Sequence, residues 1–326
     1  MNSVEVEQNY RVGLIGARGH VGSELIPLVA GHPRLELAFI SSRTLAGTRL
    51  AGHDLEFQDL SPGQVAEREA DVYVLALPNG LAAEYVAALD ASPHRQAVIV
   101  DVSADYRFDD SWVYGQPERF RDRIHRARRI ANPGCYATAA QLAIWPIAEQ
   151  LVHSPQIFGV SGYSGAGTKP SPRNDAENLR DNLIPYSLTG HLHQREISHH
   201  LDRAVFFTPH VAPFFRGITL TVSALIAEPT DSAALEAEYR RCYDSESLVR
   251  VVGSEIPLVR SIQGAHHVEL GGFSVDPTDP RHVVIVATMD NLLKGAATQA
   301  VQNINLALEL DEFAGIPVAE GGSEKS

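Results

Sequence analysis

The chain has 326 residues, 44% of them hydrophobic, and this size and composition favour a globular protein with two cores and two domains. Its 40 acidic residues against 27 basic ones give a net charge of −13, which argues against nucleic acid or an anionic membrane as a partner. No segment has the pattern of a signal peptide or the length of an apolar membrane span. The two cysteines are far apart and form no disulfide framework, so a reducing, cytoplasmic location is expected.

A dinucleotide-binding turn is predicted close to the N-terminus, after a polar leader of residues 1–9. Residues 10–15 read as a short β-strand, a Gly-x-x-Gly-x-x-Gly string follows, and the apolar residues of 25–29 then recur with a helical period. Gly16 and Gly19 allow a tight turn and a close approach of backbone to a pyrophosphate, and Gly22 lets the helix pack on the strand. A plain strand-to-helix turn is the alternative interpretation.

The end of the next strand, residues 35–40, bears on the choice of cofactor. An enzyme built for NAD tends to place an acidic side chain there for the ribose 2′-hydroxyl, whereas Ser41, Ser42 and Arg43 suit a 2′-phosphate. NADP(H) is therefore favoured over NAD, and the alternative is an exposed arginine on a polar loop.

Alternation of strands and helices continues toward the middle of the chain. Strands are expected at residues 71–77 and 97–103, with a helix at 81–89 between them. This order predicts an α/β, Rossmann-type doubly wound parallel sheet whose loops after Leu77 and Val102 share one edge with the glycine turn. Arg107 follows at that edge and could grip an anionic substrate group, or pair with a surface aspartate such as Asp109.

The chemistry is predicted to centre on Cys135. It follows the turn pair Pro133-Gly134 and opens an apolar helical run, so its thiol is expected at a helix N-terminus. Unpaired backbone N–H groups and the helix dipole favour the thiolate there, and the thiolate is the nucleophilic form. A small buried cysteine used for packing is the alternative. Cys242, in a polar helical pattern, is interpreted as structural.

The second half of the chain adds a glycine-rich wall and a histidine cluster. Gly162, Gly165 and Gly167 end a new β-run and suggest free N–H groups near the nicotinamide or a phosphate, or else a linker. His191 and His193 lie close in sequence to Glu196, which suits proton transfer by an imidazole that a carboxylate orients. A metal site is disfavoured, because no cysteine pair or downstream ligand set has the required spacing. Residues 173–182 are charged and are placed on the surface.

The remaining segments indicate a mostly antiparallel sheet with helices. Strands are expected at 218–226, 249–252, 267–270 and 283–289 and a helix at 233–243, which is an α+β pattern. The spacing of Ala and Leu predicts a long helix over about 293–312, and the tail at 313–326 is expected to be flexible.

Seven motifs in this order carry a family resemblance: Gly16-x-x-Gly-x-x-Gly-x-Glu, Ser103-x-Asp-x-Arg, Asn132-Pro-Gly-Cys-Tyr, Ser161-Gly-x-Ser-Gly-Ala-Gly, Gly190-His-x-His-x-x-Glu-Ile, Pro209-His-x-x-Pro-x-x-Arg-Gly-Ile and Asp290-Asn-Leu-x-Lys-Gly-Ala-Ala. From about Arg11 to Leu310 the chain resembles the N-acetyl-γ-glutamyl-phosphate reductases, the arginine-biosynthesis relatives of aspartate-semialdehyde dehydrogenase. One departure is Arg195, where the family usually has proline before Glu-Ile.

The resemblance implies a reaction and a domain plan. Cys135 would attack an acyl phosphate and form a thioester, which NADPH would reduce to N-acetylglutamate 5-semialdehyde, with His191 or His193 moving the proton. An NADP-binding domain would span 1–134 and be completed by the helix at about 293–312, and a catalytic and dimerisation domain would span 135–292, in a homo-oligomer, dimer or tetramer.

The resemblance also assigns residues to the two ligands. The substrate set is Arg107, Asn132, Tyr186, Glu196 and Arg216. For Arg216, an ion pair at a domain interface is the alternative. The cofactor set is Gly16, Arg18, Gly19, His20, Val21, Gly22, Ser41, Ser42, Arg43, Pro78, Ser164, Gly165 and Asn291.

Three alternatives stay open. Another acyl-phosphate reductase, acting on aspartyl phosphate or N-acetyl-aminoadipyl phosphate, would keep every catalytic part. A glyceraldehyde-phosphate dehydrogenase is disfavoured because its Ser-Cys-Thr-Thr context is absent. A non-catalytic NADP-binding sensor would bind the nucleotide without acylation of Cys135.

Overall fold

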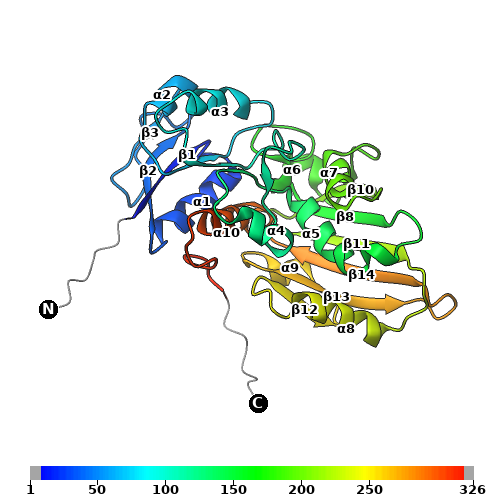
Figure 1. Cartoon of the computed structure of the whole chain (residues 1–326). Helices are drawn as coiled ribbons and strands as arrows, with labels where there is room; N and C mark the ends of the chain where they lie inside the picture. Colours follow the sequence, from blue (N-terminus) through cyan, green and yellow to red (C-terminus); the bar gives the residue numbers. More distant parts are fainter. Residues whose placement is uncertain (1–8, 319–326) are drawn as a thin grey trace, which may run out of the picture. The chain divides into compact units, whose positions relative to one another are not determined.

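The computed structural model describes residues 9–318, which divide into two compact units: residues 9–133 with 297–317, and residues 134–296. Each unit contains a seven-stranded sheet (Figure 1). Residues 1–8 of the predicted leader and 319–326 of the predicted tail lie outside the described residues. Within residues 9–318, no helix is long and apolar enough to cross a membrane.

The sheet of the first unit is entirely parallel. Its strand order is β3-β2-β1-β4-β5-β7-β6, and every neighbouring pair runs in the same direction. The elements are β1 (Tyr10–Ile15), α1 (His20–Ala30), β2 (Leu35–Ser41), β3 (Phe57–Gln58), α2 (Pro62–Ala66), β4 (Val72–Leu75), α3 (Ala82–Asp90), β5 (Val98–Asp101), β6 (Val113–Tyr114), α4 (Pro117–Ile124), β7 (Arg129–Ala131) and α10 (Thr298–Ala307). The predicted doubly wound parallel sheet is confirmed.

The centre of this sheet explains why the sequence pattern was readable. All residues of β4 and β5 are buried, because helices cover both faces of a parallel sheet, and both strands are therefore nearly continuous apolar runs. The strand order reverses between β1 and β4, and ligands of such sheets bind at this switch point, outside the carboxyl ends of the strands. The glycine turn after β1 is located there.

Helix α10 is shorter than the sequence predicts. A π-helical segment, η3 (Leu293–Ala297), precedes it, and it ends at Ala307, where Glu309 adopts a positive φ of 59° and the Leu310 N–H donates to the Asn305 carbonyl. All ten of its residues are buried. The predicted flexible tail also begins too early, since Ile316 is buried and the Asn305 side chain donates to the carbonyl of Ala314.

The sheet of the second unit is mixed and mostly antiparallel, as predicted. Its order is β12-β13-β14-β11-β8-β10-β9, and the β8/β10 and β12/β13 pairs are parallel. The elements are α5 (Cys135–Ile144), η1 (Trp145–Gln150), β8 (Gln156–Gly162), η2 (Tyr163–Ala166), α6 (Ala176–Leu179), β9 (Ile184–Pro185), α7 (Leu192–Leu201), β10 (Phe206–Ala212), β11 (Ile218–Leu225), α8 (Ser232–Tyr243), β12 (Val249–Gly253), α9 (Val259–Ile262), β13 (Val268–Val275) and β14 (His282–Met289).

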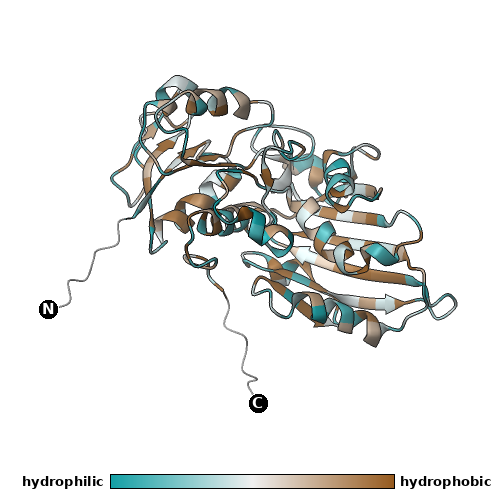
Figure 2. Cartoon of the chain, viewed as in Figure 1, coloured by the Kyte–Doolittle hydropathy of each residue, from teal (hydrophilic) through white to brown (hydrophobic). Residues whose placement is uncertain are grey.

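Helix α5 is the central helix of this unit. Every residue after Cys135 in it is buried, and it packs in a core formed by the buried apolar residues of the sheet, whose strands alternate brown and pale segments in Figure 2. Its last carbonyls lack partners within the helix, and two tyrosines of α8 satisfy them: Tyr243 donates to Leu142 at 2.8 Å and Tyr239 donates to Ala143. The helix that carries the thiol is thus held at its far end by hydrogen bonds.

Candidate active site

The thiol of Cys135 lies at the start of α5. Gly134 is the N-cap residue, Cys135 is the first helical residue, and its side chain is half-buried. The carboxylate of Glu196, which is buried on α7, accepts a hydrogen bond from the Gly134 N–H at 2.8 Å. Helix α7 therefore fixes the turn that carries the thiol. The two residues of this contact are 62 positions apart, and the contact was not predicted from the sequence.

The backbone of Gly295 lies close to the side chain of Cys135, although Gly295 was not among the predicted site residues. A Cβ atom added to Gly295 would lie 2.7 Å from the Cβ atom of Cys135, closer than real Cβ contacts come. Only glycine fits at this position without displacing the nucleophile. Its place in the Asp290-Asn-Leu-x-Lys-Gly motif is the sequence signal that points to it.

Two histidines flank the first turn of α7. His191 is the N-cap residue, and its Nδ1 accepts a hydrogen bond from the His193 N–H at 3.0 Å. The two rings are 5.0 Å apart between centroids. Arg195, at the position where the resembling family has proline, donates its N–H to the His191 carbonyl at 3.2 Å, a bond that proline could not make.

An aromatic cluster brings the histidines, the cysteine helix and β10 together. Tyr136 is the residue after Cys135, and the centroid of its ring lies 5.8 Å from that of His193 and 4.9 Å from that of Phe207. The ring centroid of His191 lies 5.2 Å from that of Phe207 and 5.5 Å from that of Tyr186. Three predicted residues, His191, His193 and Tyr186, therefore share one site with the helix of Cys135.

The local electrostatics set the protonation states at this cluster. Burial, and then the positive charge of Arg173, lower the pKa of His191 to about 4, against a smaller opposing effect of Glu196. Burial, and then the neighbouring Cys135, raise the pKa of Tyr186 to about 12. At neutral pH His191 is uncharged and Tyr186 is protonated. Because Nδ1 of His191 accepts a hydrogen bond, its proton is on Nε2.

Arg173 is a site residue that the sequence analysis placed on the surface. Its guanidinium carbon lies 4.6 Å from the centroid of the Tyr186 ring, and its side chain is half-buried. The surrounding charged, turn-rich segment is typical of an exposed loop, so composition gave no signal for this contact.

Arg216, predicted either to bind a substrate anion or to form an ion pair at a domain interface, forms an ion pair within the second unit. Its Nε donates to Oδ2 of Asp290 at 2.6 Å and its Nη2 donates to Oδ1 at 3.2 Å, and Asp290 is fully buried. Asn291 is similarly occupied: its Oδ1 accepts from the Gly217 N–H at 2.7 Å, and its Nδ2 donates to Oγ of Ser164 at 2.9 Å. The neighbouring Gly165 is exposed.

The glycine turn after β1 packs closely against neighbouring backbone. Gly16 has a φ of +87°, and a Cβ there would lie 2.1 Å from the Ala76 carbonyl oxygen, while a Cβ on Gly22 would lie 2.6 Å from the Gly16 carbonyl oxygen. The N–H groups of Gly16 and Ala17 bind the Ser41 carbonyl at 3.0 Å. Helix α1 begins at His20, with Gly19 as its N-cap residue.

The other residues of the cofactor set differ in exposure. Ser41 and Ser42 are buried, whereas Arg18, Arg43 and Pro78 are exposed. His20 and Val21, in the first turn of α1, are half-buried.

Arg107 and Asn132 contact each other in the first unit. Arg107 is buried, its Nε donates to the Asn132 carbonyl at 2.9 Å, and its Nη2 donates to the Val102 carbonyl at 3.1 Å. The Asn132 side chain accepts from Asn303 of α10 at 3.0 Å. The alternative partner of Arg107, Asp109, accepts hydrogen bonds from Ser111 instead.

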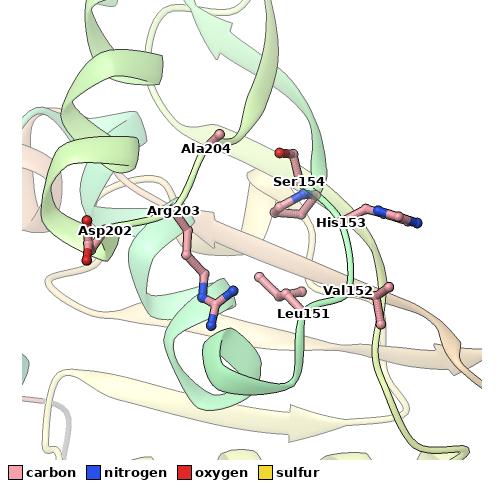
Figure 3. A pocket seen from close by; sticks show the side chains of 8 residues that line it. Leu151, Val152, His153, Ser154, Asp202, Arg203 and Ala204 are labelled. Carbon is pink, nitrogen blue, oxygen red and sulfur yellow. The ribbon is translucent and has the colours of Figure 1, made fainter.

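Two further features bear on ligands. Among residues 9–318, no three His, Cys, Asp or Glu side chains are grouped to hold a metal ion. A surface hollow of about 420 Å³ lies between residues 151–155 and 202–204 (Figure 3), and it contains none of the predicted site residues.

Comparisons with known proteins cover both units. The family model for the semialdehyde dehydrogenase NAD binding domain matches residues 11–127, and that for the semialdehyde dehydrogenase dimerisation domain matches residues 135–291. An N-acetyl-gamma-glutamyl-phosphate reductase of Xanthomonas campestris pv. campestris (strain B100) is 54% identical over 311 residues, which are 94% of this chain and 98% of that protein.

Solved structures show the same fold. Aspartate semialdehyde dehydrogenase II of Vibrio cholerae aligns with a TM-score of 0.75 at 20% identity, over 93% of this chain and 99% of the other. The aspartate semialdehyde dehydrogenase of Candida albicans, solved with NADP, aligns with a TM-score of 0.69 at 16% identity, over 92% and 99%. At these identities the likeness extends to the fold alone.

Proposed function

Because the chain belongs to the N-acetyl-gamma-glutamyl-phosphate reductase family, we propose that it reduces N-acetyl-γ-glutamyl phosphate to N-acetylglutamate 5-semialdehyde and phosphate with NADPH, in arginine biosynthesis. The observation that carries the proposal is the position of Cys135 at the N-terminus of α5, on a turn held by Glu196, where the ring of the next residue, Tyr136, packs against His193. A helix N-terminus favours the thiolate, which is the attacking species.

The chemistry divides into two steps at one sulfur. The Cys135 thiolate attacks the acyl carbon, the C–O bond to the phosphoryl group breaks, and phosphate leaves with the bonding pair, so a thioester remains. Bound NADPH would supply a hydride to the same carbon. The hemithioacetal oxyanion then collapses, the C–S bond breaks, and the thiolate is regenerated as the aldehyde departs.

We infer different tasks for the two histidines. His191 is neutral, carries its proton on Nε2 and has a pKa of about 4, so it is a poor base but a suitable hydrogen-bond donor to the acyl oxygen. His193 lies beside Tyr136, the residue after the nucleophile, and is assigned the transfer of the cysteine proton. Tyr186, protonated at neutral pH, is a second donor toward the substrate.

The first unit is assigned as the NADP-binding domain, with 134–296 as the catalytic and dimerisation domain. The glycine turn between β1 and α1 suits a pyrophosphate. Gly16 and Gly22 leave its backbone uncovered, since any side chain there would collide with backbone, and α1 begins at the same turn. Ser41, Ser42 and the exposed Arg43 would receive the 2′-phosphate.

The remaining predicted residues are assigned by their contacts. Glu196 is a positioning residue, since its buried carboxylate holds the Gly134 N–H. Arg107 donates a hydrogen bond to the Asn132 carbonyl, and we propose that both residues shape the substrate site. Asn291 acts through Ser164 and Gly217, whose loops it joins.

A homo-oligomer is part of the proposal, as is a cytoplasmic location that keeps the thiol reduced. The dimerisation-domain match covers the second unit. Phe158 and Phe206 are exposed there, at 43% and 53%, on β8 and β10, which pair directly. Large apolar side chains on one sheet face favour burial against a second copy.

The proposal is tested in the direction of phosphate-dependent oxidation. Purified protein with NADP and phosphate should oxidise N-acetylglutamate semialdehyde in preference to aspartate semialdehyde and N-acetyl-aminoadipate semialdehyde. Cys135→Ser should bind NADP normally and turn over negligibly, whereas Cys242→Ser should retain activity. A preference for aspartate semialdehyde would refute the substrate, and substantial turnover by Cys135→Ser would refute covalent catalysis.

A further inference from the structure

Arg173 holds a positive charge at the active-site cluster without a counter-ion. Its guanidinium lies over the Tyr186 ring at 4.6 Å. Nowhere in residues 9–318 does a carboxylate come within ion-pair distance of it. A half-buried guanidinium whose face lies over an aromatic ring keeps the N–H groups at its edge available for an anion.

The segment that carries Arg173 is held in place by asparagine side chains. Asn174 accepts from the Ser171 N–H at 2.7 Å and donates to the carbonyls of Gly167 and Lys169 at 2.9 and 2.8 Å. Asn178 donates to the Pro172 carbonyl at 2.7 Å. These bonds order the backbone on both sides of Arg173, and the Tyr186 ring restricts its guanidinium, so less freedom is lost when a ligand binds.

The same charge acts on two groups of the site. Arg173 contributes to the lowered pKa of His191, and it opposes the rise in the pKa of Tyr186, which also responds to Cys135. In water at physiological salt, interactions between exposed charges are largely screened beyond about 8 Å. Arg173 is therefore close enough to Tyr186 and His191 to act on a substrate that is bound to Cys135 and reaches these residues.

The substrate class requires a cation of this kind. An N-acyl-γ-glutamyl phosphate carries a carboxylate and a phosphoryl group, and a chain with a net charge of −13 attracts neither unless positive groups lie at the site. Arg216 is already paired with the buried Asp290, whereas Arg173 has no such partner among residues 9–318.

We propose that Arg173 is the residue of the second unit that binds an anionic oxygen group of the substrate, either its α-carboxylate or its phosphoryl group. The proposal rests on the proposed function and adds a specificity-determining residue to it. Arginine presents two parallel N–H donors to either group, and stacking on Tyr186 fixes the plane of the fork.

The test is the steady-state kinetics of the phosphate-dependent oxidation by Arg173→Gln and Arg173→Lys. The matched control is Arg180→Gln, on the same segment, where the arginine is exposed and paired with Glu177 at 2.7 Å. For Arg173→Gln we expect a roughly 10- to 100-fold rise in KM, which is the effect of losing a charged hydrogen bond, with kcat changed much less. The rise in KM for Arg173→Lys should be smaller than for Arg173→Gln but still measurable, because lysine keeps the positive charge and lacks the two parallel N–H donors.

The two sources of the anion are separated by which KM rises. A rise for the semialdehyde alone assigns the α-carboxylate, a rise for phosphate alone assigns the phosphoryl group, and a rise for both supports one receptor shared by them. Loss confined to kcat, or KM values equal to those of Arg180→Gln, would overturn the proposal in favour of a packing role on Tyr186.

A second measurement does not depend on turnover. In a Cys242→Ser background, Cys135 is alkylated with anionic iodoacetate and with neutral iodoacetamide, and the ratio of the two rates reports the attraction of an anion to the site. Arg173→Gln should lower this ratio several-fold, and Arg180→Gln should not. If the wild-type chain oxidised none of the three semialdehydes, the proposed function would fail, and this ratio would decide the role of Arg173: an unchanged ratio would refute it.

Discussion

The carboxylate of Glu196 accepts a hydrogen bond from the backbone N–H of Gly134 at 2.8 Å, and Gly134 directly precedes Cys135. This contact joins α7, whose N-terminal end carries His191 and His193, to the N-terminus of α5, which carries Cys135. The relative position of sulfur and imidazoles therefore depends on one buried side chain that need not touch the substrate.

Glu196→Ala should lower both stability and activity, because it leaves the buried Gly134 N–H without that acceptor. The expected loss in the free energy of unfolding is about 1–3 kcal/mol, measured by urea denaturation. Glu196→Gln keeps an acceptor oxygen and should lose less. Glu149, which is exposed, supplies the control Glu149→Gln, with no expected change. Equal behaviour of the Ala and Gln variants would contradict the role assigned to the hydrogen bond.

The lowered pKa of His191 predicts a pH dependence of stability. Its folded pKa is about 4, below the usual 6.5, so between these values the unfolded chain binds a proton at this residue that the folded chain does not. His191 therefore contributes to a fall in the free energy of unfolding as the pH drops from 6.5 toward 4. Above pH 6.5 it contributes no such dependence.

His191→Asn isolates this effect, since asparagine can still cap α7 but does not titrate. Melting temperatures measured from pH 7 to pH 4.5 should fall less steeply for the variant than for the wild type. His199→Asn, an exposed histidine of the same helix, is the comparison and should follow the wild-type slope. Parallel curves for His191→Asn and the wild type would show that its pKa is ordinary.

Much of the first unit could be predicted because its elements follow strong local rules. The strands β1, β2, β4 and β5 are apolar runs bounded by turns, and the glycine turn after β1 has one structural solution. The two-residue strands β3 and β6 were not predicted, because a strand of that length has no period to detect. Their pairing is decided by tertiary contacts.

The candidate site was predictable only where chemistry and local sequence coincide. Cys135 follows a turn pair at a helix start, and the two histidines stand out by residue type, so these residues could be named in advance. Helix α7 itself was missed, since few apolar residues mark it and its start is capped by His191. The contacts of Glu196 and Arg173 depend on folding together segments that no local pattern relates.

Arg43→Gln tests the choice between NADP and NAD. If Arg43 binds the 2′-phosphate, its loss should raise the KM for NADPH roughly 10- to 100-fold, the effect of a charged hydrogen bond, and leave the KM for NADH nearly unchanged. Arg49→Gln is the matched control, because Arg49 is exposed in the same loop region and pairs with Asp54 at 3.0 Å. An equal loss with both nucleotides would refute the 2′-phosphate assignment.

The ion pair of Arg216 and Asp290 predicts a stability effect in place of a binding effect. Asp290 is fully buried, and besides Arg216 it accepts hydrogen bonds from the N–H groups of Gly264 and Leu292 at 2.7 and 2.9 Å. Arg216→Met leaves this carboxylate without its counter-charge, and removing one partner of a buried pair costs about 3–5 kcal/mol. The neutral double variant Arg216→Met with Asp290→Asn should recover part of that loss.

Arg281→Met is the control for this prediction, since Arg281 and Asp279 form an ion pair of similar length, 2.9 Å, on the surface. Exposed pairs contribute little to stability because water and salt screen them, so its unfolding midpoint in urea should barely move. If Arg216→Met instead kept the wild-type midpoint and raised the KM for substrate, Arg216 would bind an anion. A large shift in the midpoint, partly reversed by Asp290→Asn, follows only if the guanidinium serves the buried carboxylate.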